Sequence, residues 1–190
     1  MRGPLLRAPI AFRYPREQQR LEQATSLRLA GGVALPGQVR LAQPYHERMW
    51  YEYYDPKVKD LTYDQSDYIK SWMEEFDEVM SSDNFAHPED GYKKYIRTKS
   101  FIYMMFVNEI SKGIDNYMFS TYFHKENDED GGQLNAGPPW DYNLGYGNVN
   151  YGEDWNAAET YGWGYPQGSR TYWFERLMED EAYRNKVYCR

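Results

Sequence analysis

The chain has 190 residues, a net charge of −7 and 18% aromatic residues. This length predicts one domain, at most with an appendage, that is large enough to bury a hydrophobic core. The acidic charge argues against nucleic-acid binding, no apolar run of about 18 residues is present to span a membrane, and a single cysteine, Cys189, excludes an internal disulfide.

Residues 1–50 differ in composition from the rest of the chain. They contain eight arginines and three glutamates but no lysine and no aspartate, whereas both are frequent afterwards. We interpret them as an Arg-rich N-terminal segment that is disordered or not native to the domain, which then comprises residues 51–190. Residues 1–45 are expected to be poorly ordered, although partial helical spacing allows a short helix over residues 17–29. The apolar stretch at the start is too short and proline-broken for a signal peptide.

An amphipathic helix is predicted directly after Thr62. Thr62 and Gln65 have the spacing of a capping box, in which each side chain satisfies an unpaired backbone N–H of the first turn. Apolar side chains then recur at helical spacing from Tyr68 to Met80, and charged side chains occupy the opposite face. The turn cluster at residues 81–84 should end this helix.

A second helix is predicted over residues 98–112. Its apolar side chains cover most of the circumference, so we expect it to be buried on nearly all sides. Lys112 and Gly113 are typical of a helix C-terminus. Asn108 and Glu109 are polar exceptions, which we expect to brace nearby backbone rather than to bind a ligand directly.

Residues 117–123 are aromatic and β-branched, which favours a strand, and residues 134–136 are its predicted hairpin partner across a polar turn. Beyond Asn148 the many Gly, Tyr, Trp and Asn residues predict a long ordered loop. A final helix is expected to begin at Trp173 and to run toward Tyr188.

Two aspartates follow regular elements in this part of the chain. Asp115 comes directly after the second helix, and Asp141 comes shortly after the predicted hairpin. Carboxylates just past rigid elements are held in place and can still reach a ligand. This arrangement suits a site for a metal ion and a phosphate.

These segments resemble the C-terminal half of the spore coat protein H (CotH) kinase family. The resemblance covers roughly residues 58–190 and also includes the first helix. It rests on the stretches GYKKYIRTKSFIYMMFVNEISKGIDNYMFSTYFHK, GGQLNAGPPWDYNLGYGN and WFERLMEDEAYRNKV. The combination of NEISK with the following aspartate, STYFHK and GPPWD is specific, although no single motif would be.

The resemblance implies an α+β, atypical protein-kinase-like C-lobe, mostly helical, with a short β-hairpin and long aromatic-rich loops. It implies transfer of phosphate from ATP to Ser or Thr of a protein substrate, with Mg²⁺ or Mn²⁺. Asp115 matches the catalytic aspartate, Asp141 the aspartate that holds the metal, and Ser120 the position where kinases often have a metal-binding asparagine. It also suggests a secreted, cell-surface or spore-coat location.

The chemistry of the three residues is consistent with these roles. Mg²⁺ prefers oxygen ligands and is typically held by one or two carboxylates and by phosphate, so Asp141 is suited to it. Asp115 can act as a general base toward a substrate hydroxyl. Ser120 offers only a neutral oxygen, and Asn143 is an alternative ligand.

The sequence departs from the kinase pattern upstream of residue 58. No GxGxxG motif is present, and no lysine precedes Lys57. Kinase catalysis needs a phosphate-covering loop and a lysine that contacts the nucleotide. We therefore expect a truncated fragment that lacks the N-lobe and has weak or absent kinase activity.

Two other functions are compatible with the sequence. A cell-surface module that binds glycans or proteins without catalysis would use exposed aromatic rings, and Trp140, Trp155, Trp163 and Trp173 are the candidates. The acidic run at residues 126–131 resembles the start of an EF-hand calcium loop, but its twelfth position would be Gly137 rather than glutamate, so a solvated hairpin turn is the simpler explanation.

Overall fold

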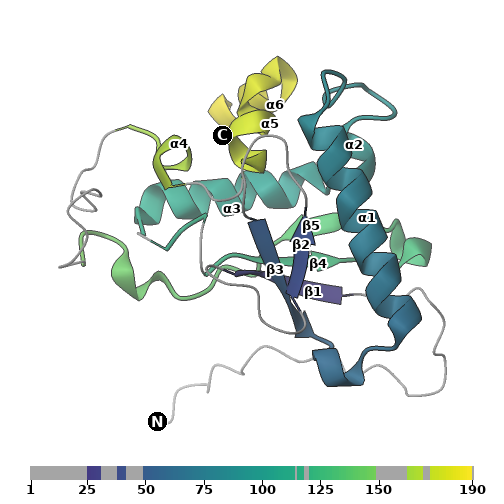
Figure 1. Ribbon diagram of the computed structural model, residues 1–190. Coiled ribbons are helices and arrows are strands. Elements are labelled where there is room, and N and C mark those ends of the chain that lie inside the picture. Colours follow the sequence, from purple (N-terminus) through teal and green to yellow (C-terminus); the bar gives the residue numbers. More distant parts are fainter. Residues whose placement is uncertain are drawn as a thin grey trace, which may run out of the picture.

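The computed structural model describes residues 25–30, 38–41, 49–113, 115–117, 120–148, 162–168 and 172–189. Within these residues one five-stranded antiparallel sheet has the order β2-β3-β1-β4-β5, and helices pack against it (Figure 1). The predicted α+β class is confirmed. The strands are β1 (Thr25–Ala30), β2 (Gln38–Leu41), β3 (Met49–Asp55), β4 (Tyr122–Lys125) and β5 (Leu134–Ala136).

Strands β1 and β2 lie within the segment that was predicted to be disordered. Strand β1 is the central strand, because it pairs with both β3 and β4. The short helix that the spacing allowed over residues 17–29 is not observed where the structure describes these residues, since residues 25–29 belong to β1. Residues 1–24, 31–37 and 42–48 of this segment lie outside the described residues, and the expectation of a poorly ordered or non-native segment stays a prediction.

The helices account for most of the regular structure that follows. They are α1 (Tyr63–Ser81), α2 (Tyr92–Tyr95), α3 (Thr98–Ser111), α4 (Tyr165–Gly168), α5 (Trp173–Glu179) and α6 (Glu181–Tyr188), with short 3₁₀ turns η1 (Val58–Asp60), η2 (Asp128–Asp130) and η3 (Tyr142–Leu144). The capping box of α1 is confirmed: Thr62 Oγ1 accepts from the Gln65 N–H at 3.2 Å, and Gln65 Oε1 accepts from the Thr62 N–H at 2.9 Å. In the described parts of the chain, none of the helices has the length and apolarity that a membrane crossing requires.

Helix α3 lies between the sheet and the C-terminal helices, contacting β5 on one side and α6 on another (Figure 1). Its position matches the prediction, but its burial does not. Tyr103 is 45% exposed and Ile110 is 67% exposed, so one side of α3 is open to solvent. Apolar composition did not identify this side, because the polar residues Asn108 and Glu109 turn inward instead of outward.

An aromatic core joins the sheet to the helices. Trp173 of α5 is completely buried; its ring stacks on Tyr51 of β3 with centroids 5.5 Å apart, and it meets Phe76 of α1 at 4.7 Å and Phe123 of β4 at 5.4 Å. Edge-to-face and stacked pairs at these separations add to the stabilisation from buried area. The core therefore fixes β3, β4, α1 and α5 relative to one another.

The hairpin was predicted with one strand misplaced. Its second strand, β5, has the predicted bounds, but the first runs over Tyr122–Lys125 instead of residues 117–123. Residues 115–117 form a turn in which Tyr117 has φ of 63°, a left-handed conformation that is incompatible with a strand. Residues 118–119 lie outside the described residues.

The predicted final helix is divided in two at Asp180. This residue has ψ of 116°, and it caps α6 by accepting a hydrogen bond from the Ala182 N–H at 3.0 Å. Its carboxylate also accepts from Tyr92 Oη at 2.6 Å. Burial opposes ionisation of Asp180, but the hydrogen bonds from Tyr92 and Ala182 prevail and lower its pKa.

Replacing Asp180 with alanine should destabilise the domain by about 1–2 kcal/mol at pH 7, because the N-cap of α6 is lost. A carboxylate whose pKa is lowered by folding contributes stability above its unfolded pKa and loses it as the pH falls through the folded value. The difference between wild type and Asp180→Ala should therefore shrink below about pH 4. Urea unfolding at pH 7 and pH 3, with the exposed Asp83→Ala as control, measures this; an undiminished difference at pH 3 would contradict it.

Candidate active site

Asp115 lies in the turn that follows α3. The helix ends at Lys112, whose backbone is left-handed with φ of 51°, and the chain then turns through residues 115–117. Asp115 is half-buried. Burial raises the pKa of its carboxyl group, and the negative charge of Asp141 raises it further. The two aspartates are therefore close enough to interact electrostatically, although β4 and β5 separate them along the chain.

Asp141 is exposed and directly precedes the 3₁₀ turn η3. Its backbone is left-handed, with φ of 64° and ψ of 51°. In the described residues the non-glycine positions with positive φ are Lys112, Tyr117, Asp141 and Tyr146, and all of them lie in the two segments that carry the aspartates. Such conformations persist where the surrounding structure enforces them, and they concentrate at functional sites.

One buried residue of α3, Asn108, is bonded to both segments. Its backbone carbonyl accepts from Asn116 Nδ2 at 2.9 Å, and its side-chain Oδ1 accepts from Tyr142 Oη at 2.7 Å. Asn116 directly follows Asp115, and Tyr142 directly follows Asp141. Sequence reasoning missed Asn116 and Tyr142, although their position next to the candidate aspartates was a usable signal.

The backbone of the Asp141 segment also packs closely on the end of α3. The Tyr146 N–H donates to the Ser111 carbonyl at 2.5 Å. A Cβ at Gly145 would lie 2.8 Å from the same oxygen, so only glycine allows this approach. The segment is thus attached to α3 at two points, Asn108 and Ser111.

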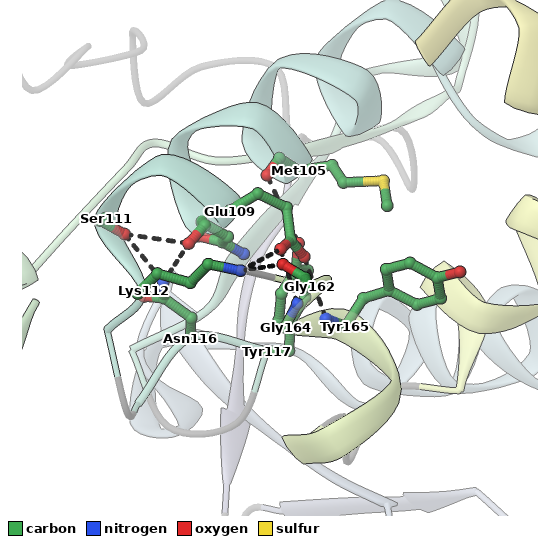
Figure 2. Close-up of polar contacts among 10 residues, drawn as sticks. Met105, Glu109, Ser111, Lys112, Asn116, Tyr117, Gly162, Gly164 and Tyr165 are labelled. Carbon is green, nitrogen blue, oxygen red and sulfur yellow. Dashed lines mark hydrogen bonds and ion pairs between the residues drawn. The ribbon is translucent and has the colours of Figure 1, made fainter. Parts of the chain in front are cut away.

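Glu109 joins α3 to the Asp115 turn and to residues 164–165, as Figure 2 shows. Its carboxylate accepts from the backbone N–H groups of Gly164 at 2.6 Å and Tyr165 at 3.0 Å, and from Tyr117 Oη at 2.8 Å. Lys112 Nζ lies 3.2 Å from Glu109 Oε2 and donates to the Gly162 carbonyl. The prediction that Glu109 braces nearby backbone is therefore confirmed, and residues 162–165 are held beside the Asp115 turn. The Asn108 side chain accepts from the Tyr142 hydroxyl rather than from backbone.

The other predicted ligands are less closely associated with the aspartates. Between described residues, no hydrogen bond or ion pair joins Ser120, which is half-buried, to Asp115 or Asp141. Asn143 is exposed. No group of three or more His, Cys, Asp or Glu side chains in the described residues is arranged to hold a metal ion. A pair of carboxylates does fit Mg²⁺ or Mn²⁺ when phosphate oxygens complete the coordination.

The tryptophans considered for glycan binding have different environments. Trp173 is buried in the core and serves packing. Trp140 is 55% exposed beside Asp141, and Trp163 is 36% exposed, whereas Trp155 lies outside the described residues. Trp140 and Trp163 thus expose ring surface, but among the described residues these two rings do not stack on each other.

The acidic run at residues 126–131 forms the turn between β4 and β5. Asp128 accepts from Lys125 Nζ at 2.7 Å and from Tyr68 Oη at 2.6 Å. Lys125 is itself buried on β4, with its ammonium over the rings of Tyr68 and Trp72. This carboxylate therefore neutralises a buried lysine, as expected for a structural hairpin turn.

Comparison with known protein families assigns the chain to one family. The family model described as CotH kinase protein matches residues 39–190, which is most of the chain. The chain belongs to the CotH kinase family. The family match begins within β2, twelve residues before the predicted domain start at residue 51, so most of β2 and all of β3 lie within the matched residues. No curated protein and no solved structure matches the chain.

Proposed function

We propose that this chain carries the catalytic and metal-binding aspartates of a phosphotransferase that moves phosphate from ATP to Ser or Thr of a protein. Membership of the CotH kinase family gives a kinase-like function at the family level. The observation that supports the finer proposal is that Asn116, next to Asp115, and Tyr142, next to Asp141, both donate hydrogen bonds to Asn108 of α3.

Each aspartate has a role that its surroundings favour. Asp141 is exposed and held in a fixed backbone conformation, so its carboxylate is available to a divalent ion. When bound, Mg²⁺ or Mn²⁺ would orient the phosphates of ATP and neutralise the charge that spreads over them during transfer. Ser120 is the proposed secondary ligand.

Asp115 is proposed to accept the proton of the substrate hydroxyl. Its raised pKa makes the carboxylate a better base than an exposed aspartate, because proton affinity increases with pKa. The Asp115 turn is fixed on one side by Asn116 and on the other by Tyr117, whose hydroxyl donates to Glu109. Such support keeps a general base within reach of its substrate.

Thermal unfolding with and without nucleotide tests the proposal. A ligand present at 100 times its Kd stabilises the folded state by about 2.7 kcal/mol. We expect Mg·ATP or Mn·ATP to raise the Tm of the wild type, and ATP with EDTA to raise it less. In Asp141→Asn the extra stabilisation by the metal should disappear, while the Tm without ligand should stay close to that of the wild type, because Asp141 is exposed.

Two results would contradict the proposal. An equal response of wild type and Asp141→Asn to Mg·ATP would exclude Asp141 as the metal ligand. A rise in Tm with oligosaccharides, together with no response to any nucleotide, would instead support the binding module without catalysis, and the exposed Trp140 would be its first candidate contact.

A further inference from the structure

Asn108 occupies an unusual position for a polar side chain. It is only 2% exposed and lies on the inner side of α3, among buried apolar residues such as Met104 and Met105. A buried amide is costly unless it is hydrogen-bonded. Its backbone carbonyl and its side-chain oxygen accept hydrogen bonds from different segments of the chain, and each donor residue directly follows one of the two aspartates.

The two bonds act from opposite ends of the same residue. The main-chain carbonyl receives Asn116 Nδ2, which also donates to Ser111 Oγ at 2.9 Å. The side-chain oxygen receives Tyr142 Oη. Because both acceptors belong to one residue of a rigid helix, a shift of either segment stretches a bond to the same fixed point. Asn108 is thus a single residue of α3 to which both segments are bonded.

We propose that Asn108 is a positioning residue that sets the separation of the Asp115 and Asp141 carboxylates, through Asn116 on one side and Tyr142 on the other. The expected effect on metal binding rests on the proposed function. The tether itself, meaning the hydrogen bonds from Asn116 and Tyr142 to Asn108, does not depend on it. Mg²⁺ and Mn²⁺ accept oxygen ligands only within narrow distances, so a small displacement of the Asp141 segment should weaken metal binding. A misplacement of about 1 Å can also cost about 100-fold in rate.

The test uses Tyr142→Phe, which deletes only the hydroxyl that bonds to Asn108. Tyr146→Phe is the matched control, because it makes the same chemical change on an exposed ring of the same segment. Mn²⁺ affinity is measured by electron paramagnetic resonance in the presence of a non-hydrolysable ATP analogue. Loss of one hydrogen bond should weaken Mn²⁺ binding by about two- to tenfold in Tyr142→Phe, and the control should change by less than about twofold.

Two further measurements separate positioning from a general loss of stability. In the Asp141→Asn background, Tyr142→Phe should cause no additional loss of Mn²⁺ affinity, as a double-mutant cycle requires when one residue acts through the other. Asn116→Ala, which releases the other end of the tether, should also weaken binding. Weaker urea stability in Tyr142→Phe with unchanged Mn²⁺ affinity would overturn the proposal and leave Asn108 a purely structural residue.

Amide hydrogen exchange keeps the tether testable even if the proposed function fails. The Tyr146 N–H, bonded to the Ser111 carbonyl, should exchange faster in Tyr142→Phe than in the wild type or in Tyr146→Phe. Faster exchange in a chain that binds no Mn²⁺ would support the tether and refute the metal site. Unchanged exchange would refute the tether itself, whatever the metal affinity.

Discussion

Replacing Asp115 with asparagine should abolish the weak phosphate transfer that we expect of this chain, because a general base usually contributes about 10²–10⁴-fold to the rate. The substitution keeps the size of the side chain and removes its ability to accept a proton. Binding of Mg·ATP should be retained, because the metal is assigned to Asp141. Transfer of radioactive phosphate to a mixed protein substrate, measured beside the Tm shift with Mg·ATP, checks both parts.

The same substitution should leave stability unchanged or slightly increased. A carboxyl group whose pKa is raised by folding binds protons more tightly in the folded state, so its ionised form opposes folding above that pKa. Asparagine removes this penalty. Asp60→Asn, at an exposed aspartate in η1, is the control. Loss of transfer together with loss of folding in Asp115→Asn would indicate a structural role and contradict the assignment.

Replacing Trp173 with alanine should lower the free energy of unfolding by about 3–5 kcal/mol, the usual cost of removing a large aromatic side chain from a core. Its ring packs on Tyr51, Phe76 and Phe123, and its Nε1 donates to the buried Asp77 carboxylate at 3.2 Å. The variant would lose the cavity-filling ring and one donor to a buried charge. Since domains of this kind are stable by only about 5–15 kcal/mol, this loss is a substantial part of the total stability.

Urea unfolding followed by circular dichroism measures this effect. Trp140→Ala removes a ring of the same size that is 55% exposed, and it should cost less than about 1 kcal/mol. If the two variants proved equally destabilised, the aromatic core would not be the main support of the fold. Trp173→Phe should recover part of the loss, because a smaller ring keeps some of the contacts.

The sequence predicted local elements best where the residues that determine them lie within one or two helical turns of one another. The capping box of Thr62 and Gln65 and the end of α3 near Lys112 depend on neighbouring residues, and both are observed. Strand β1 was mistaken for part of a helix, because its conformation is decided by pairing with β3 and β4, which follow it by many residues. Strand β4 was placed too early, since nothing local showed that Tyr117 would be left-handed.

The same distinction between local and long-range determinants applies to the candidate site. The two aspartates and their family could be inferred from the order of elements and from the motifs around them, because residue type and spacing are properties of the chain itself. Asp115 and Asp141 remain proposed site residues, and Ser120 has no described contact with either.

The sequence alone determined which carboxylates this protein can offer and which family it belongs to. Only the tertiary structure decided that Asn108 accepts hydrogen bonds from the residues next to both aspartates. It also decided that Glu109 holds residues 164–165 and that Ile110 of α3 is exposed. The physical reason is the separation along the chain of the residues that interact. Hydrogen bonds and packing between distant segments depend on how the whole chain folds, and no local pattern of residues encodes them.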